Sequence, residues 1–419
     1  MYALCDQRSF YASCECIFRP DLRDKPVTVL SNNDGCVVAL NQHAKARGIE
    51  KFTPYFKQRD QLKAAGGAVF SSNYTLYGEV SRRIMQTLQS EVPRHEVYSI
   101  DEGFSDLSGI ADRDLKPLAR HLKQRIWREQ RIPMGVSIAT TKTLAKIGQY
   151  AAKTYPQLGG VCFIEHDHQR IWLLQRTPIK EVWGVGRALS KKLESMQIRT
   201  ALDLSKMRLT DARKLFGVCL VRTVHELNGI PCIPLEEQPD PRQNIVCTRS
   251  FGERLTELAD INVAMANYVA RACEKLRKQE LYAGRMSVFL QTSRFDDHPY
   301  SREASISLPG GSDDTCRCTG LAIQILEPLF KPGFRYAKAG IGFLDLRPAT
   351  GWQLDCFTPY EANNHKLMSV MDQINKRFEN GSIRTARQGR RARFTMQREM
   401  LSPSYLTQWS DLPTVYTRI

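Results

Sequence analysis

Residues 1–11 read Met1-Tyr-Ala-Leu-Cys-Asp-Gln-Arg-Ser-Phe-Tyr11. Tyr2–Asp6 predicts a short β-strand, and Phe10–Phe18 predicts the helix that follows it. A second stretch, Tyr98-Ser-Ile-Asp-Glu-Gly-Phe104, places Asp101 and Glu102 in a turn between two expected strands. Neighbouring strands lie about 4.8 Å apart. Asp6, at the end of one strand, can therefore meet a turn that carries two more carboxylates.

The rest of residues 1–165 alternates strand-like and helix-like patterns. Runs of β-branched and apolar residues between turn residues predict strands over 25–31, 36–40, 95–100, 104–107 and 134–139. Apolar residues that recur on one helical face predict helices over 74–88, 115–126 and 143–153. This order predicts a central sheet covered by helices.

The pattern changes twice in the remaining chain. Short helices replace strands over 166–236, and the stretch 237–244 has two prolines and no apolar residue, as interdomain linkers do. Residues 245–347 then predict the order β-α-β-β-α-β, a ferredoxin-like split βαβ arrangement. In one of its strands, Met286, Val288 and Leu290 alternate with polar and aromatic residues and should form the buried face. The predicted fold class is α+β with several domains.

The composition indicates a polyanionic partner. The 419 residues include 60 Lys and Arg against 44 Asp and Glu, a net charge of +16, and such an excess is typical of nucleic-acid binding. A basic surface that serves only solubility is the alternative. No apolar run is long enough to span a membrane. The twelve cysteines include no C-x-x-C pair, which favours free thiols in a reducing cytoplasm over metal ligands.

The three carboxylates suit metal-assisted phosphoryl transfer. Transfer from a nucleoside triphosphate uses divalent ions that activate the attacking hydroxyl and neutralise the leaving pyrophosphate. Mg²⁺ prefers oxygen ligands and keeps some waters, so two or three carboxylates suffice. Most isolated Asp-Glu pairs are solvated turn residues, and only the flanking sequence favours the functional interpretation.

That flanking sequence resembles the Y-family, or translesion, DNA polymerases and is similar to the bacterial UmuC proteins. The similar blocks are Asp6–Ser13, Ser31–Cys36, Tyr98–Phe104 and Gly135–Lys146, and the resemblance covers essentially the whole chain. It implies a right-hand-like palm over 1–24 and 76–165, small fingers over 25–75, and a helix-hairpin-helix thumb over 166–236. After the 237–244 linker, it implies a little-finger domain over 245–347 and a docking tail over 348–419.

The resemblance also implies roles for individual residues. Asp6, Asp101 and Glu102 would hold two Mg²⁺ ions, with the backbone carbonyl of Gln7 as a further ligand. Tyr11 matches the steric-gate aromatic that collides with a 2′-hydroxyl, although a core aromatic facing the sheet is the alternative. Lys45 and Lys153 match positions that hold the incoming triphosphate, and ordinary exposed lysines are the alternative. Three positions depart from the family pattern: Arg8, Gln42 and Gly103.

Further positions are candidates for contacts with DNA and partners. Gly184 and Gly186 can form a tight turn that presents backbone amides to a phosphate, with Arg187 and Lys191 nearby. In the 245–347 unit, the candidate phosphate contacts are Arg249, Arg285 and Arg294. The stretch Gln353-Leu354-Asp-Cys-Phe357 resembles the peptide that docks on a sliding clamp, with the smaller Cys356 at its fourth position.

The sequence thus predicts a cytoplasmic, error-prone DNA-directed DNA polymerase that acts in the DNA-damage (SOS) response. Its expected ligands are primer-template DNA and dNTPs, and the resemblance implies a processed UmuD-like dimer, a RecA filament and the sliding clamp as partners. A non-catalytic DNA-binding scaffold is the main alternative. A nuclease or a nucleotide cyclase on a similar palm is another, although a cyclase has no need of a DNA-gripping thumb.

Overall fold

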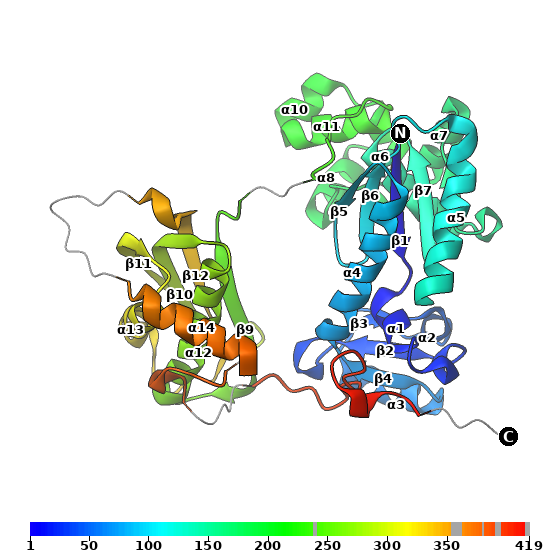
Figure 1. Ribbon diagram of the computed structural model, residues 1–419. Helices are drawn as coiled ribbons and strands as arrows, with labels where there is room; N and C mark the ends of the chain where they lie inside the picture. Colours follow the sequence, from blue (N-terminus) through cyan, green and yellow to red (C-terminus); the bar gives the residue numbers. More distant parts are fainter. Residues whose placement is uncertain (238–240, 353–362, 379–380, 390–394, 415–419) are drawn as a thin grey trace. The chain divides into compact units, whose positions relative to one another are not determined.

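The protein was analysed as a computed structural model, which describes residues 1–237, 241–352, 363–378, 381–389 and 395–414. Two compact units share the chain (Figure 1). The first comprises Met1–Ser31, Gly35–Pro239 and Glu399–Ile419, and the second comprises Asn32–Asp34 and Asp240–Arg398. The chain therefore leaves the first unit, builds the second and returns with its last residues to the first.

The first unit is built on a five-stranded sheet with the order β5-β6-β1-β7-β8. Its central strand β1 (Tyr2–Gln7) pairs antiparallel with β6 (Glu102–Asp106) and with β7 (Met134–Ala139). Strand β5 (Arg94–Val97) forms one edge, and the short β8 (Val161–Phe163), parallel to β7, forms the other. The predicted strands of the sheet are present, whereas β8 was not expected.

Strand alternation sends the side chains of β1 to two different layers. Ala3 and Cys5 pack in the core beneath α1 (Phe10–Glu15), α4 (Tyr74–Glu91) and α5 (Asp112–Gln130). Leu4 belongs to the other core, which α6 (Lys142–Thr154) covers. Because side chains two residues apart share a face, Asp6 faces α6, as Leu4 does.

Short helices pack beside α6, as predicted for residues 166–236. They are α7 (Asp167–Arg176), α8 (Arg187–Ser195), α9 (Ala201–Ser205), α10 (Leu209–Phe216) and α11 (Val218–Leu227). The buried Glu226 of α11 accepts a hydrogen bond from the Thr143 amide in the first turn of α6, at 2.9 Å. A carboxylate there is also favoured by the helix dipole, so α11 fixes the start of α6.

A buried ion pair fixes α6 against the sheet. Lys142, at its first position, pairs with Glu96 of β5 and donates a hydrogen bond to the Pro234 carbonyl at 2.7 Å. Both charged side chains are buried, so each would be costly without its partner.

We expect Lys142→Met to lower the free energy of unfolding of the first unit by about 3–5 kcal/mol, because the Glu96 carboxylate would stay buried without its cation. Thermal denaturation followed by circular dichroism measures this as a lower melting temperature. The matched control is Arg59→Met at the exposed Arg59–Asp60 pair, where a change within about 0.5 kcal/mol is expected. Equal melting temperatures for the two variants would contradict the role of the buried pair.

A small sheet of order β3-β2-β4 forms another part of the first unit. It consists of β2 (Val27–Leu30), β3 (Val37–Leu40) and β4 (Ala68–Ser71), and α2 (Gln42–Ala46) and α3 (Tyr55–Ala64) accompany it. Its own small core includes Leu30, Ile49 and Leu62, and Met400 of the C-terminal segment packs against this core.

The second unit has the predicted β-α-β-β-α-β order. Its elements are β9 (Ile245–Leu255), α12 (Leu258–Arg277), β10 (Leu281–Gln291), β11 (Ser301–Ser312), α13 (Thr315–Leu326) and β12 (Tyr336–Pro348). The strand order β11-β10-β12-β9 is antiparallel throughout, so each helix connects two parallel strands with a third between them. Met286, Val288 and Leu290 are buried in its core, which confirms the predicted face.

A last helix, α14 (His365–Phe378), follows this sheet. The short 3₁₀ helices are η1 (Pro20–Leu22), η2 (Asn32–Asp34), η3 (Pro156–Leu158), η4 (Ile179–Glu181), η5 (Glu327–Leu329), η6 (Ala349–Gly351), η7 (Ala386–Gln388) and η8 (Trp409–Asp411). No helix among the described residues is long and apolar enough to cross a membrane. The eleven cysteines that the structure describes are free thiols, as predicted.

Two helices differ from the predicted ranges, one in length and one in position. The helix expected over Phe10–Phe18 ends at Glu15. Pro20 disfavours helical backbone only at Arg19, so it does not account for this earlier end. The helix expected over 319–330 begins earlier, at Thr315, and ends at Leu326, where Pro328 converts its last turn to η5.

Candidate active site

The structure brings the three predicted carboxylate residues together at one end of the central sheet. Asp6 of β1 lies directly opposite Glu102 of β6 in the antiparallel register. The Gln7 amide donates a hydrogen bond to the Asp101 carbonyl at 2.9 Å. Asp6 therefore meets the Asp101–Glu102 stretch as expected, but Glu102, which was predicted to lie in the turn, is the first residue of β6.

Two lysines of α6 reach the two carboxylates that face this helix. Lys153 Nζ lies 2.7 Å from Asp6 Oδ2, and Lys146 forms an ion pair with Glu102. The two lysines are seven residues apart, or about two helical turns, so they share a face. Lys146 was not predicted to be a site residue, and this spacing from Lys153 is the signal that could have found it.

The site holds its carboxylates in unequal protonation states. Burial raises the pKa of Asp6 to about 7, and its hydrogen bond to Glu102 adds to the increase. Burial also opposes the ionisation of Glu102, but hydrogen bonds from Asp6 and Lys146 lower the pKa of Glu102 below its usual range. Near neutral pH, Asp6 is thus partly protonated and donates to an ionised Glu102.

The oxygen ligands at this end of the sheet fit a divalent cation. Carboxylate oxygens from two adjacent strands, with Asp101 in the turn beside them, are the hard ligands that Mg²⁺ prefers. Among the described residues, no group of three or more His, Cys, Asp or Glu side chains is already arranged around a metal position. In this structure the lysine ammonium groups balance the negative charge of the carboxylates, and a bound divalent cation would balance that charge instead.

Tyr11 lies on α1, at the border between core and surface. Its ring stacks on the buried Tyr77 ring of α4, with centroids 4.5 Å apart and planes at 14°, and Tyr74 meets it edge-on at 6.0 Å. Tyr11 itself is only half-buried. The ring therefore packs on the core through one side and keeps some surface free for a ligand.

Beneath this stack lies a buried acid that the sequence did not single out. Tyr77 Oη donates a hydrogen bond to Glu15 Oε1 at 2.6 Å. Burial raises the pKa of Glu15 to about 7, although hydrogen bonds from Tyr77 and Ser402 act in the opposite direction.

We expect Glu15 to make the first unit less stable as pH rises. Its folded-state pKa of about 7 exceeds the ordinary value of 4.5, so the unfolded chain releases this proton first. Between these pH values, Glu15 should lower the free energy of unfolding by roughly 3 kcal/mol. Melting temperatures of the unaltered chain and of Glu15→Gln, measured at pH 5 and pH 7.5, test this. The unaltered chain should lose more stability than the variant, and equal losses would contradict the prediction.

The structure explains two of the departures from the family pattern. A Cβ atom on Gly103 would lie 2.5 Å from Cε1 of the His95 ring, so the ring would have to move to accommodate a larger residue there. Arg8 donates a hydrogen bond to the Ala152 carbonyl at 2.6 Å, near the C-terminal end of α6. A cation at that end is favoured by the helix dipole, so Arg8 serves to hold α6.

The predicted glycine turn is present before α8. Gly184 has a φ of +88°, which side chains rarely allow, and Gly186 caps the helix. Arg187 and Lys191 of α8 are exposed. Trp183 donates a hydrogen bond to Tyr98 Oη at 3.1 Å, which connects this turn to the segment that precedes Asp101.

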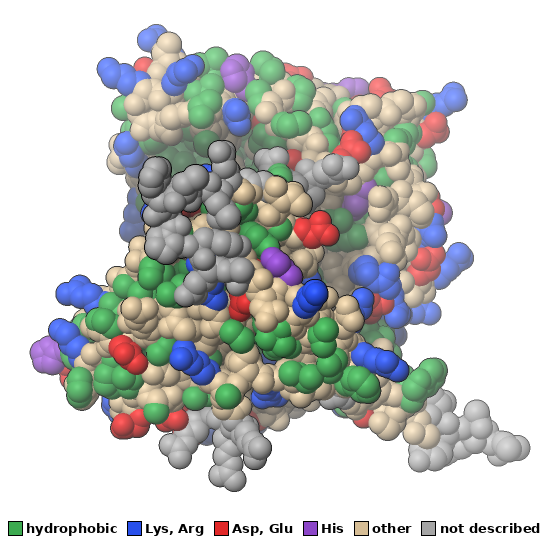
Figure 2. Space-filling model, turned by 60° about the vertical axis from the view of Figure 1, so that its left-hand side comes forward, with side chains coloured by type: hydrophobic (Ala, Val, Ile, Leu, Met, Phe, Trp, Pro, Cys, Tyr) green, Lys and Arg blue, Asp and Glu red, His purple; other side chains and the backbone are tan. Residues whose placement is uncertain are grey.

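The other basic candidates are surface residues. Lys45 is exposed on α2, and its link to a triphosphate stays a prediction. Arg249 is exposed on β9, and exposed Arg285 lies 3.5 Å from Asp345. On the face that Figure 2 shows, Lys and Arg side chains are spread over the surface and form no single patch.

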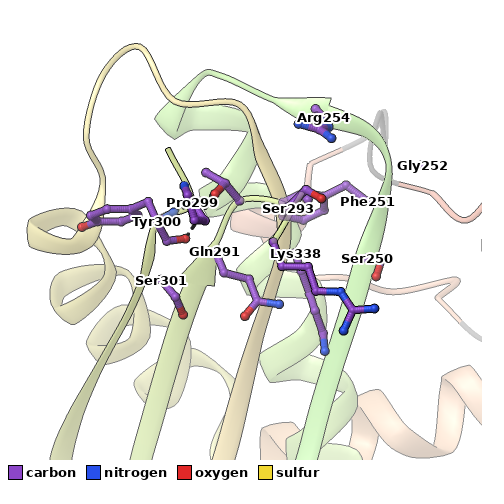
Figure 3. Close-up of a pocket in the computed structure, with 13 residues that line it drawn as sticks. Ser250, Phe251, Gly252, Arg254, Gln291, Ser293, Pro299, Tyr300, Ser301 and Lys338 are labelled. Carbon is purple, nitrogen blue, oxygen red and sulfur yellow. Dashed lines mark hydrogen bonds between the residues drawn. The ribbon is translucent and has the colours of Figure 1, made fainter. Parts of the chain in front are cut away.

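A pocket of about 640 Å³ lies at one end of the sheet of the second unit. Arg294 lines it, together with Arg254 from β9 and Lys338 from β12 (Figure 3). Arg254 is paired with Asp296 at 2.5 Å. Gln353, Leu354 and Phe357 lie outside the described residues.

Comparisons with known proteins agree with this architecture. Models described as the impB/mucB/samB family, its C-terminal domain and the IMS family HHH motif match residues 5–149, 242–356 and 170–198. A domain of unknown function (DUF4113) matches 365–415. UmuC of Salmonella typhimurium is 44% identical over 98% of this chain and 99% of its own length. MucB of Escherichia coli is 43% identical over 99% of each.

Solved structures show the same fold at lower identity. A Y-family DNA polymerase chimera of Dbh and Dpo4 has a TM-score of 0.66 and 21% identity, and the match covers 82% of this chain and 98% of that one. DinB from Sulfolobus solfataricus has a TM-score of 0.51, with 21% identity and the same coverage.

The fold is that of the Y-family DNA polymerases. The chain belongs to the impB/mucB/samB family, which includes UmuC and MucB, and it is a DNA-directed DNA polymerase of the translesion class. Polymerases of this kind depend in general on a divalent metal ion.

Proposed function

We propose that the chain extends a DNA primer with dNTPs at the end of strands β1 and β6 of the central sheet, where Asp6, Asp101 and Glu102 hold two Mg²⁺ ions. The observation that carries this proposal is the register of β1 and β6, which sets Asp6 opposite Glu102 beside the turn that holds Asp101. When bound, the ions would polarise the attacking primer hydroxyl and neutralise the charge on the leaving pyrophosphate.

The residues of the chain would prepare this site for the metal. Asp6 and Glu102 would supply oxygen ligands to a bound cation. The backbone carbonyl of Gln7 is a further proposed ligand. Lys153 and Lys45 would bind the triphosphate, and Lys153 already lies within reach of the carboxylates, at 2.7 Å from Asp6. If its ion pair with Asp6 is broken, the Lys153 ammonium group could contact a phosphate bound on the same side of the site.

Tyr11 is the proposed gate against ribonucleotides. Its stacking on the buried Tyr77 fixes the ring, while its half-exposed face is available to lie under a sugar. A fixed ring under C2′ excludes a hydroxyl because the packed side chains behind it leave no room to retreat.

The other domains would hold the duplex. We propose that residues 1–24 and 76–165 are the palm, 25–75 the fingers, 166–236 the thumb and 245–347 the little finger, with 237–244 as the linker. Gly184, Gly186, Arg187 and Lys191 would bind one DNA backbone in the thumb. Arg249 and Arg285, together with the Arg294 pocket, would bind phosphates in the little finger.

The biological setting is also proposed. Translesion synthesis in the SOS response, in the cytoplasm at the nucleoid, suits a family that includes UmuC. A processed UmuD-like dimer, a RecA filament and the sliding clamp are the proposed partners. Gln353, Leu354 and Phe357 are the proposed clamp-binding residues within the 348–419 tail.

Primer extension by the purified chain tests the proposal. The assay uses undamaged and abasic templates with Mg²⁺ and dNTPs, with and without a UmuD-like dimer and a RecA filament, and an EDTA arm removes the metal. Extension that requires Mg²⁺ supports the polymerase. Binding of DNA without extension under every condition would support the scaffold, and shortening of the primer would indicate a nuclease.

A further inference from the structure

We propose that the C-terminal segment 399–406 is part of the support of the gate residue Tyr11, and that Ser402 is a positioning residue for the selection of deoxyribose over ribose. This proposal rests on the proposed function of Tyr11. The segment falls within the 365–415 match to a domain of unknown function. It lies almost 400 residues along the chain from the gate, yet it belongs to the same compact unit.

The segment is held firmly on the first unit. Met400 and Ser71, the last residue of β4, exchange two hydrogen bonds, one from the Ser71 amide at 2.9 Å and one to the Ser71 hydroxyl at 3.0 Å. Further along, the Tyr405 ring stacks on Phe18 with centroids 4.5 Å apart. In Figure 1 this red segment lies against the small sheet.

Between these anchors, Ser402 reaches the interior. Its hydroxyl accepts a hydrogen bond from Asn73 Nδ2 at 3.0 Å and donates one to Glu15 Oε1 at 3.3 Å. Asn73 is itself the N-cap of α4, where its side chain accepts a bond from the Leu76 amide. One hydroxyl of the C-terminal segment thus ties the first turn of α4 to the last residue of α1.

The carboxyl oxygen that accepts from Ser402 also connects the segment to the gate residue Tyr11. Glu15 Oε1 also accepts the hydrogen bond from Tyr77 Oη at 2.6 Å, and the Tyr77 ring is the surface on which Tyr11 stacks. Ser402, Glu15 and Tyr77 are 4%, 1% and 0% exposed, so no solvent replaces a lost bond. Removing the Ser402 hydroxyl leaves Asn73 and Glu15 partly unsatisfied and frees the ring under Tyr11 to shift.

The measurement is the ratio of kcat/KM for dNTP to kcat/KM for the matching rNTP, with the full chain under conditions in which the unaltered chain extends a primer. Ser402→Ala and Tyr77→Phe are each expected to lower this ratio about 5- to 10-fold. The reason is that a buried group which loses its hydrogen-bond partner costs about as much free energy as one to two hydrogen bonds contribute. Ser402→Thr keeps the hydroxyl and should restore selectivity. Glu15→Gln keeps the Oε1 acceptor and should also stay near the unaltered ratio.

Ser410→Ala is the matched control, because Ser410 is an exposed serine of the same C-terminal region whose hydroxyl donates a hydrogen bond to the neighbouring Asp411. A purely structural role would lower dNTP and rNTP use equally, and that result would overturn the proposal. So would unchanged ratios in both Ser402→Ala and Tyr77→Phe. Tyr11→Ala, measured in parallel, shows which proposal has failed. If Tyr11→Ala also leaves the ratio unchanged, Tyr11 is not the gate. If Tyr11→Ala is the one variant that changes the ratio, Tyr11 is the gate but Ser402 does not support it.

Discussion

The Asp101→Ala/Glu102→Ala double variant is expected to lose primer extension by roughly 1,000-fold or more, while its DNA binding stays within a few-fold of the unaltered chain. The change would remove two of the three proposed metal-binding carboxylates at this end of the sheet. Asp6 would then face Lys153 alone, at 2.7 Å, in a site with too little negative charge to hold divalent ions. A loss of several kcal/mol of transition-state stabilisation follows.

Single-turnover extension with saturating dNTP measures the loss, and a gel-shift titration measures DNA binding. Asp60→Ala is the control, because Asp60 is a highly exposed acid on α3 that forms an ion pair with its neighbour Arg59. The assignment is refuted if the double variant extends primers at the rate of the control. Loss of DNA binding in parallel with extension would indicate damage to the fold, which the melting temperature reveals.

Tyr11→Ala should raise the use of rNTPs relative to dNTPs by about 10- to 100-fold. The ring is fixed by Tyr77 at 4.5 Å and by Tyr74 at 6.0 Å, so it cannot move away from a 2′-hydroxyl. Forcing extra atoms into a packed site costs about 1–3 kcal/mol, which the alanine removes. Incorporation of dNTP should also fall several-fold, because the sugar loses the surface on which it rests.

Tyr11→Phe is the informative comparison for this change. It keeps the ring and its stacking on Tyr77, so it should keep discrimination near that of the unaltered chain. The measurement is extension by one nucleotide with each rNTP and dNTP. If Tyr11→Ala and Tyr11→Phe show the same ratio, Tyr11 is a core aromatic and the gate lies elsewhere.

Local sequence patterns determined much of this protein. Period-two alternation places Leu4 and Asp6 on one face of β1, and the turn at Asp101 follows from its neighbours, so the meeting of the carboxylates could be predicted. The β-α-β-β-α-β order of the second unit likewise follows from the secondary-structure preferences of its individual segments. Pro328 follows directly after the end of α13, and its effect on the chain is local too.

Contacts between distant segments were decided by tertiary structure alone. No periodicity specifies that the His95 ring lies against Gly103 or that Arg8 binds the end of α6. Ser402 and Glu15 are 387 positions apart and meet only because the chain returns to its first unit. Sequence patterns record how each residue fits its near neighbours, whereas these contacts depend on how finished helices and strands pack against one another.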